Sequence, residues 1–134
     1  MEKMHKLMNQ LSSKYSDSWI IRERYVDVKL RRRKRHHRLY IRREGKYYTF
    51  TSVIMGNAAV TKNTKTWNEL ALMAWDRNAN HEIVSFAFDK INRLVGVIRH
   101  PAEHLDPEEL ELYITVLTFE CDRFEFLLSG KDRF

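Results

Sequence analysis

The side chains with nucleophilic or metal-binding chemistry are few, and their spacing suits neither role. Cys121 is the only cysteine, and it falls on the apolar face of a predicted helix, where cysteine usually packs as a small hydrophobic side chain. His100 and His104 lie four residues apart, but Pro101 between them disfavours the helical pair of ligands that zinc sites use. None of the four glycines belongs to a phosphate-binding loop. We therefore expect no catalytic residue, no metal site, no cofactor and no enzyme.

A basic run over residues 31–38 is the strongest chemical motif in the chain. Clustered lysine and arginine gain affinity for phosphate groups by displacing counterions, so the run is a candidate finger for anions or nucleic acid. Tyr40, Tyr47 and Tyr48 beside it would then stack on bases, although aromatic residues at strand spacing more often belong to a core. His36 and His37 are expected to be exposed at its tip. The candidate contacts are Arg31, Arg32, Arg33, Lys34, Arg35 and Arg38.

The same run has a second interpretation, since stretches of charge are commonly solvated. It would then be a hairpin that protects a sheet edge and pairs with an acidic segment of its own or another subunit. The distribution of charge allows both interpretations. Residues 22–46 hold 12 basic and three acidic side chains, a balance of +9 against a total of +6. Residues 103–125 hold eight carboxylates and one basic residue, Arg123.

Length and composition indicate one domain over residues 1–134. A chain of this length buries roughly two thirds of its unfolded surface, and 43% apolar residues supply material for a core. The single cysteine fits the reducing cytoplasm. The N-terminus lacks the apolar region of a signal peptide, and no stretch approaches the roughly 18 apolar residues of a membrane span. We expect a cytoplasmic protein without a membrane partner.

The first half of the chain predicts one helix and three strands. Apolar residues at helical spacing, from Met4 to Tyr15, predict a short amphipathic helix that ends near Ser16. Alternating patterns then predict strands over residues 19–30, with Ile20 on the inner face, and over residues 38–43. A third strand is expected over residues 47–60, with a kink at the single glycine of that stretch.

The second half predicts a helix, a hairpin and a longer helix. The first helix is expected to begin at Thr66 and to carry Trp75 on its apolar stripe, before the break near Asn78. Two β-rich runs, residues 83–89 and 94–99, are joined by a four-residue turn and predict a hairpin. The complete order is therefore α-β-β-β-α-β-β-α, an α+β fold in which helices cover an antiparallel five-stranded sheet.

The terminal helix is the most clearly marked element. Asp106 is a good N-cap, Pro107 suits the first helical position, and Glu109 completes a capping box. One continuous apolar face consists of Leu110, Ile114, Leu117, Cys121, Phe124 and Leu128. A helix that lies on one sheet face needs only one such stripe, so a second stripe predicts burial against a subunit or a partner. That candidate interface consists of Leu112, Tyr113, Val116, Phe119 and Phe126.

The second half also resembles a known family. The resemblance rests on three segments: residues 83–89, residues 93–96, and the stretch from His100-Pro101 through Leu105-Asp106-Pro107-Glu108-Glu109-Leu110 to Cys121-Asp122-Arg123-Phe124-Glu125. They resemble YbjN-type bacterial proteins, whose fold is that of class I type III secretion chaperones. The quoted similarity covers about residues 66–132, while the first half matches only in its order of elements.

The resemblance implies a homodimer that binds segments of other proteins without catalysis. Secretion chaperones of this kind hold an extended stretch of a partner along apolar grooves and exposed strand edges. The basic stretch over residues 22–46 departs from the acidic character that is typical of them. The leading hypothesis is a dimeric, chaperone-like protein-binding module with an unknown protein partner. The alternative is a nucleic-acid-binding protein that uses the basic hairpin.

Overall fold

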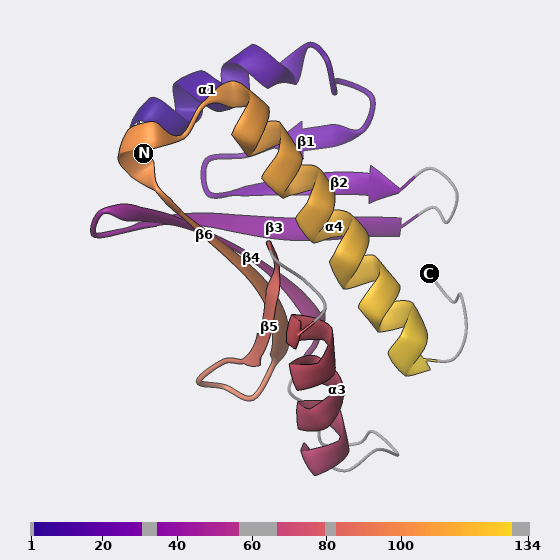
Figure 1. The fold of residues 1–134 in the computed structure, drawn as a ribbon. Helices are drawn as coiled ribbons and strands as arrows, with labels where there is room; N and C mark the ends of the chain where they lie inside the picture. The colour runs from indigo at the N-terminus through magenta and orange to yellow at the C-terminus, as the bar shows by residue number, and fades with distance from the viewer. Residues whose placement is uncertain (1, 31–34, 57–66, 80–82, 130–134) are drawn as a thin grey trace.

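The computed structural model describes residues 2–30, 35–56, 67–79 and 83–129. Within them, a six-stranded antiparallel sheet carries two helices across one face (Figure 1). The strands lie in the order β1-β2-β3-β4-β6-β5. Their bounds are β1 Trp19–Ile21, β2 Tyr25–Leu30, β3 Arg35–Glu44, β4 Tyr47–Met55, β5 Ser85–Phe88 and β6 Leu94–Pro101. The helices are α1 Glu2–Ser12, α3 Trp67–Ala79, α4 Pro107–Ser129 and the short 3-10 helix η1 Ala102–His104.

The prediction of five strands is wrong, because the expected strand over residues 19–30 folds into a hairpin. Strands β1 and β2 pair antiparallel, with Trp19 opposite Val28. The chain reverses between them, and the Arg22 N–H donates to the Tyr25 carbonyl oxygen at 2.9 Å. This turn contains no glycine, proline or asparagine, the residues that usually mark a reversal in a sequence.

The reversal also moves Ile20 to the other face. Trp19 is buried in the core while Ile20 is exposed, the opposite of the expected placement of Ile20. The expected strand over 38–43 is longer in the structure, and β4 ends at Met55 after a register shift that begins at Val53. The remaining part of the predicted third strand, residues 57–60, lies outside the described residues, as does the expected helix start at Thr66.

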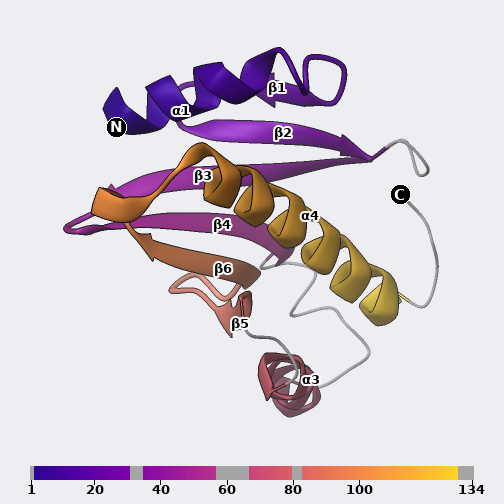
Figure 2. The same cartoon turned by 45° about the horizontal axis from the view of Figure 1, so that its top comes forward.

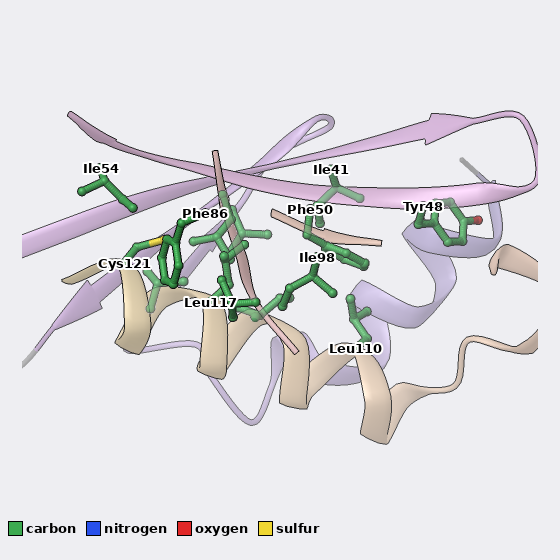
Figure 3. Packing of buried hydrophobic residues seen from close by; sticks show 14 of the residues in the cluster. Ile41, Tyr48, Phe50, Ile54, Phe86, Ile98, Leu110, Leu117 and Cys121 are labelled. Carbon is green, nitrogen blue, oxygen red and sulfur yellow. The ribbon is translucent and has the colours of Figure 1, made fainter. Parts of the chain in front are cut away.

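Helix α4 crosses the sheet and forms the main core with it. It contacts β3, β4 and β6, and Figures 1 and 2 show α1 beside its N-terminal half. All six residues of its predicted inner face are buried, which confirms that stripe. Sheet residues such as Ile41, Phe50 and Ile98 point toward this helix (Figure 3). Each large apolar side chain buried in this way contributes roughly 1.5–3 kcal/mol.

The start of α4 also confirms the predicted capping box. The Glu109 N–H donates to the Asp106 carboxylate at 2.8 Å, and the Asp106 N–H donates to Glu109 Oε1 at 3.3 Å. One turn further on, the Glu111 carboxylate accepts hydrogen bonds from Lys14 and Tyr15, which follow α1. These bonds fasten the end of α1 to α4 and so complete the helical layer on that face.

Helix α3 lies at the other end of the sheet, beside β5 (Figure 1). Leu70 and Ala74 face the core and are buried, but Trp75, which was expected on the same stripe, is exposed. The Arg77 guanidinium donates to Glu120 on α4 at 3.0 Å. The hairpin of β5 and β6 agrees with the prediction. Among the described helices, none combines the length and the hydropathy that crossing a bilayer requires.

Candidate functional site

The structure covers only part of the predicted basic finger. Residues 31–34 lie outside the described residues, and of Arg35 only the backbone, the first residue of β3, is described. Arg38 donates to both carboxylate oxygens of Asp27, at 2.8 and 3.1 Å. These bonds raise the pKa of Arg38. Its guanidinium also lies 4.0 Å from the centre of the Tyr25 ring, so Arg38 is already engaged within the fold.

His37, the neighbour of Arg38, lies on the opposite face of β3 and is buried, which corrects the expectation that it is exposed. Its Nε2 atom is 3.2 Å from Asp122 and 3.7 Å from Glu125, both on α4. Successive side chains of a strand point to opposite faces of the sheet. His37 therefore points toward α4, and Arg38 points away from it. The contact joins the basic run to the acidic terminal helix of the same chain.

The three tyrosines beside the basic run have separate environments. Tyr48 is fully buried in the core, whereas Tyr40 and Tyr47 are exposed. The Arg99 guanidinium lies 4.6 Å from the centre of the Tyr47 ring. Tyr40 packs beside Tyr25, with the two ring centres 6.0 Å apart and the ring planes tilted by 60°. Tyr48 is therefore unavailable for stacking on a ligand.

The second apolar stripe of α4 is partly open. Leu112 is 47% exposed and Phe119 is 60% exposed, and Val116 and Phe126 are half-buried. Tyr113 is half-buried and points inward, since its ring packs against Phe50 and its hydroxyl lies 2.7 Å from His100 Nδ1. Burial raises the pKa of the Tyr113 hydroxyl. Leu112, Val116 and Phe119 thus form the accessible part of the predicted interface.

A second exposed apolar surface lies on α3, and the sequence analysis did not predict it. Trp75 is 70% exposed and Leu72 is 66% exposed, the largest values among the exposed large hydrophobic side chains. Residues three apart lie next to each other on a helix surface, so these two side chains form one patch. The signal was present in the sequence as a second apolar pair beside the buried Leu70 and Ala74.

The two edges of the sheet differ in their capacity to accept another strand. At the β5 edge, the Asn78 side chain accepts from the Phe86 N–H at 2.5 Å and donates to the Phe86 carbonyl at 2.9 Å. The carboxamide of Asn78 therefore occupies the position of a neighbouring strand. At the β1 edge, Ser18 and Arg22 bond toward β2, so the alternation of an antiparallel ladder directs the backbone groups of Ile21 outward.

The face of the sheet opposite α4 carries a hollow of about 790 Å³. Tyr40 and Arg42 lie on this face because they alternate with buried Leu39 and Ile41. The remaining lining residues are Arg22, Glu23, Arg24, Tyr25, Thr51, Val53 and Arg93. Together with Tyr40 and Arg42, these residues come from the β1–β2 turn, from the three strands β2, β3 and β4, and from the position before β6. This combination of basic and aromatic side chains arises only through folding.

Cys121, His100 and His104 contact different groups in the described part of the chain. Burial raises the pKa of the Cys121 thiol to about 12, which suppresses the reactive thiolate. His100 contacts Tyr113 and lies 3.5 Å from Glu109, while His104 is exposed. The described residues contain no cluster of three or more histidine, cysteine, aspartate or glutamate side chains placed to hold a metal ion.

Comparison with known proteins identifies a fold and not a family. A scan against protein-family models finds no match, and neither does a search of curated proteins. Solved structures do match. A chain of the ExsC–ExsE complex superposes with a TM-score of 0.65 at 15% identity, over 95% of this chain and 94% of that one. A chain of the ExoU–SpcU complex from the Pseudomonas aeruginosa type III secretion system gives 0.60 at 15% identity, over 82% and 87%.

The Yersinia pestis type III secretion chaperone SycH, solved with a fragment of YscM2, belongs to the same group of structures. It superposes with a TM-score of 0.52 at 11% identity, over 87% of this chain and 94% of the matched chain. At such identities the similarity concerns the fold. The chain therefore has the α+β fold of type III secretion chaperones over most of its length.

Proposed function

We propose that the protein is a non-enzymatic, chaperone-like module that binds an extended segment of another protein. One observation carries the proposal: in a fold matched by chaperone chains, β1 is an edge strand, and within the described residues no strand pairs with its outer side, where Ile21 directs its backbone groups. Main-chain pairing at such an edge supplies affinity, and neighbouring side chains supply selectivity. The exposed α4 side chains Leu112, Val116 and Phe119 offer an apolar contact for the same partner. The relationship to YbjN-type proteins belongs to this proposal.

The strand-edge contact is tested by changing one backbone group. Ile21→Pro removes the outward N–H of β1, which an edge position tolerates, and Ile21→Ala is the matched control that loses side-chain packing but keeps the N–H. Both variants and the wild type serve as bait in affinity capture from the native cell, with nuclease treatment in parallel. A protein that survives nuclease and is lost only with Ile21→Pro supports the proposal. Capture unaffected by Ile21→Pro would remove strand pairing from it.

We further propose that the working unit is a homodimer joined through α3. Exposed tryptophan is enriched among the residues that dominate protein interfaces, and Trp75 lies with Leu72 on a helix outside the α1–α4 layer. Light scattering should give a dimer for the wild type and a monomer for Leu72→Glu with Trp75→Glu. Val116→Asp with Phe119→Asp is the matched pair on α4, and it should stay dimeric. A monomeric wild type refutes the homodimer, and dissociation by the α4 pair alone assigns the contact to α4.

Nucleic-acid binding remains the alternative function of the basic run. Arg38 is engaged by Asp27 and Tyr48 is buried, so a nucleic-acid site would depend on residues 31–35 and on the exposed tyrosines. Titration with single- and double-stranded oligonucleotides at two salt concentrations tests it. Affinity that does not fall steeply with salt, or that survives neutralisation of residues 31–35, removes this alternative.

A further inference from the structure

The hollow on the open face of the sheet has an aliphatic and aromatic floor under a basic rim. Thr51 and Val53 are half-buried in the middle of the sheet, and Tyr25 and Tyr40 stand beside them. Helices α1 and α4 lie on the other face, so within the described residues neither covers this floor (Figure 2). A ligand that fills the hollow must therefore offer apolar side chains to the sheet and polar groups to the rim.

The rim carries positive charge that the described part of the chain leaves unpaired. Arg22, Arg24 and Arg42 line the hollow and form no ion pair with a described carboxylate. The fourth arginine, Arg93, is held by Asp89 at 2.7 Å. Glu23 supplies the single carboxylate among the lining residues. Three exposed guanidinium groups around one concave surface attract a ligand of negative charge.

The aromatic side chains in the hollow are poorly arranged for stacking nucleic-acid bases. Arg38 already covers one face of the Tyr25 ring at 4.0 Å. The Tyr40 ring is tilted by 60° to that of Tyr25, so the pair offers no flat platform for successive bases. Aliphatic floor residues such as Val53 suit apolar amino-acid side chains instead. The chemistry of the hollow thus favours an acidic polypeptide over a nucleic acid.

We infer that this hollow binds an acidic amphipathic segment of a protein partner, with apolar side chains on Val53 and Tyr40 and carboxylates on Arg24 and Arg42. The inference rests on the proposed protein-binding function and adds the sign of the partner's charge. The contact uses side chains on the open sheet face, and neither the backbone N–H of Ile21 nor the exposed surface of α3 takes part in it. A failure here therefore leaves the edge experiment and the dimer experiment unaffected.

The test uses one defined peptide in two charge forms. A fluorescein-labelled peptide of about 14 residues, with apolar and polar positions alternating as in an extended amphipathic segment, carries glutamate at its polar positions, and its twin carries lysine there. Fluorescence anisotropy with the full-length protein measures both, together with a labelled single-stranded oligonucleotide. The acidic peptide should bind most tightly, and its affinity should fall as salt is raised. Equal affinity for the two peptides, or tighter binding of the oligonucleotide, would overturn the inference.

Two double variants of equal charge locate the contact. Arg24→Glu with Arg42→Glu reverses two rim residues, and Lys6→Glu with Arg123→Glu makes the same change at exposed positions on α1 and α4. The rim variant should weaken binding of the acidic peptide at least about fivefold. The matched variant should retain nearly wild-type affinity, after thermal unfolding has shown that both remain folded. Equal losses in the two variants would mean that net charge, and not the hollow, attracts the peptide.

Discussion

Gly96 on β6 is the residue that lets α4 lie directly on the sheet. A Cβ atom at this position would lie 2.5 Å from Cys121 Sγ and 3.2 Å from Leu117 Cδ1. The first distance is a clash and the second is tight, and both partners belong to the buried face of α4. The requirement for glycine here therefore arises from packing between a helix and a strand.

The first prediction follows from this contact. Gly96→Ala should lower the free energy of unfolding by about 1–3 kcal/mol, because extra volume in a packed core forces its neighbours to shift. Urea denaturation measures the change. Cys121→Ala removes the sulfur that the new methyl group meets, so the double variant should be more stable than the sum of the two single changes predicts. If the two changes in the free energy of unfolding simply add, Cys121 is not the side chain that the new methyl group displaces.

Glu111 is the residue whose ionisation fastens α1 to α4. Hydrogen bonds from Lys14 and then from Tyr15 lower the pKa of the Glu111 carboxyl from the ordinary value of 4.5. A carboxyl with a lowered pKa in the folded state stabilises the fold above its unfolded pKa, and this contribution is lost as the pH falls through the folded value.

The second prediction is a pH dependence with this sign. The difference in stability between wild type and Glu111→Gln should be largest near neutral pH and should shrink as the pH falls below about 4.5. Urea denaturation from pH 7 to pH 3 measures it. Glu108→Gln removes a carboxylate from the same helical turn without an ion pair among the described residues, and its difference from wild type should vary less. Parallel profiles for the two variants would contradict the assignment.

At the scale of elements, one side chain closes the middle of the β5 edge. Asn78 hydrogen-bonds both backbone groups of Phe86 and so joins the end of α3 to the sheet. Open strand edges invite pairing with other chains, and native folds usually block them. The Asn78 carboxamide does so with one donor and one acceptor.

The third prediction concerns this closure. Asn78→Ala should destabilise the protein by about 1–3 kcal/mol, because two backbone groups lose their partner, and the Phe86 amide should exchange faster with solvent. Asn78→Asp keeps an acceptor for that amide and loses the donor, so the amide should stay more protected than in the alanine variant. Hydrogen exchange followed by NMR measures both. Unchanged exchange at Phe86 in the alanine variant would show that something else protects this edge.

Elements marked by local signals are the ones that the sequence predicts well. The capping box of Asp106 and Glu109 fixes the start of α4, and an uninterrupted apolar period fixes its buried face. The turn over residues 22–24 carries no such signal and depends on distant contacts, such as the Ile41 N–H that donates to the Arg24 carbonyl at 3.0 Å. For this reason the sequence predicts five strands, whereas the described sheet has six.

The candidate surfaces were less predictable because they depend on how distant strands pair. Arg24 and Arg42 share one hollow only because β3 lies between β2 and β4. A basic run in the sequence indicated the sign of the charge but not which side chains remain available, since Arg38 is engaged and His37 is buried. For Trp75, helical periodicity alone cannot distinguish a wide buried stripe from a buried stripe beside an exposed one.

At the scale of the whole molecule, the two faces of the sheet have different surroundings. The face under α1 and α4 holds the core, and the opposite face presents the basic hollow. Helix α3 lies at one end of the sheet, with its exposed pair turned away from the core. Elements with few buried contacts open more readily than the core does, and hydrogen exchange reports that opening.

The last prediction uses this difference to locate the dimer contact within the complete protein. In the monomer, α3 amides should exchange faster than those of the inner face of α4, because only one side of α3 is buried. If a second copy covers Trp75, exchange along α3 should slow between about 1 µM and about 100 µM protein, since association stabilises by mass action. Hydrogen exchange with mass spectrometry measures both segments. Leu72→Glu with Trp75→Glu should abolish the concentration dependence in α3, and a wild type that associates over this range without slower exchange in α3 would place the dimer contact elsewhere.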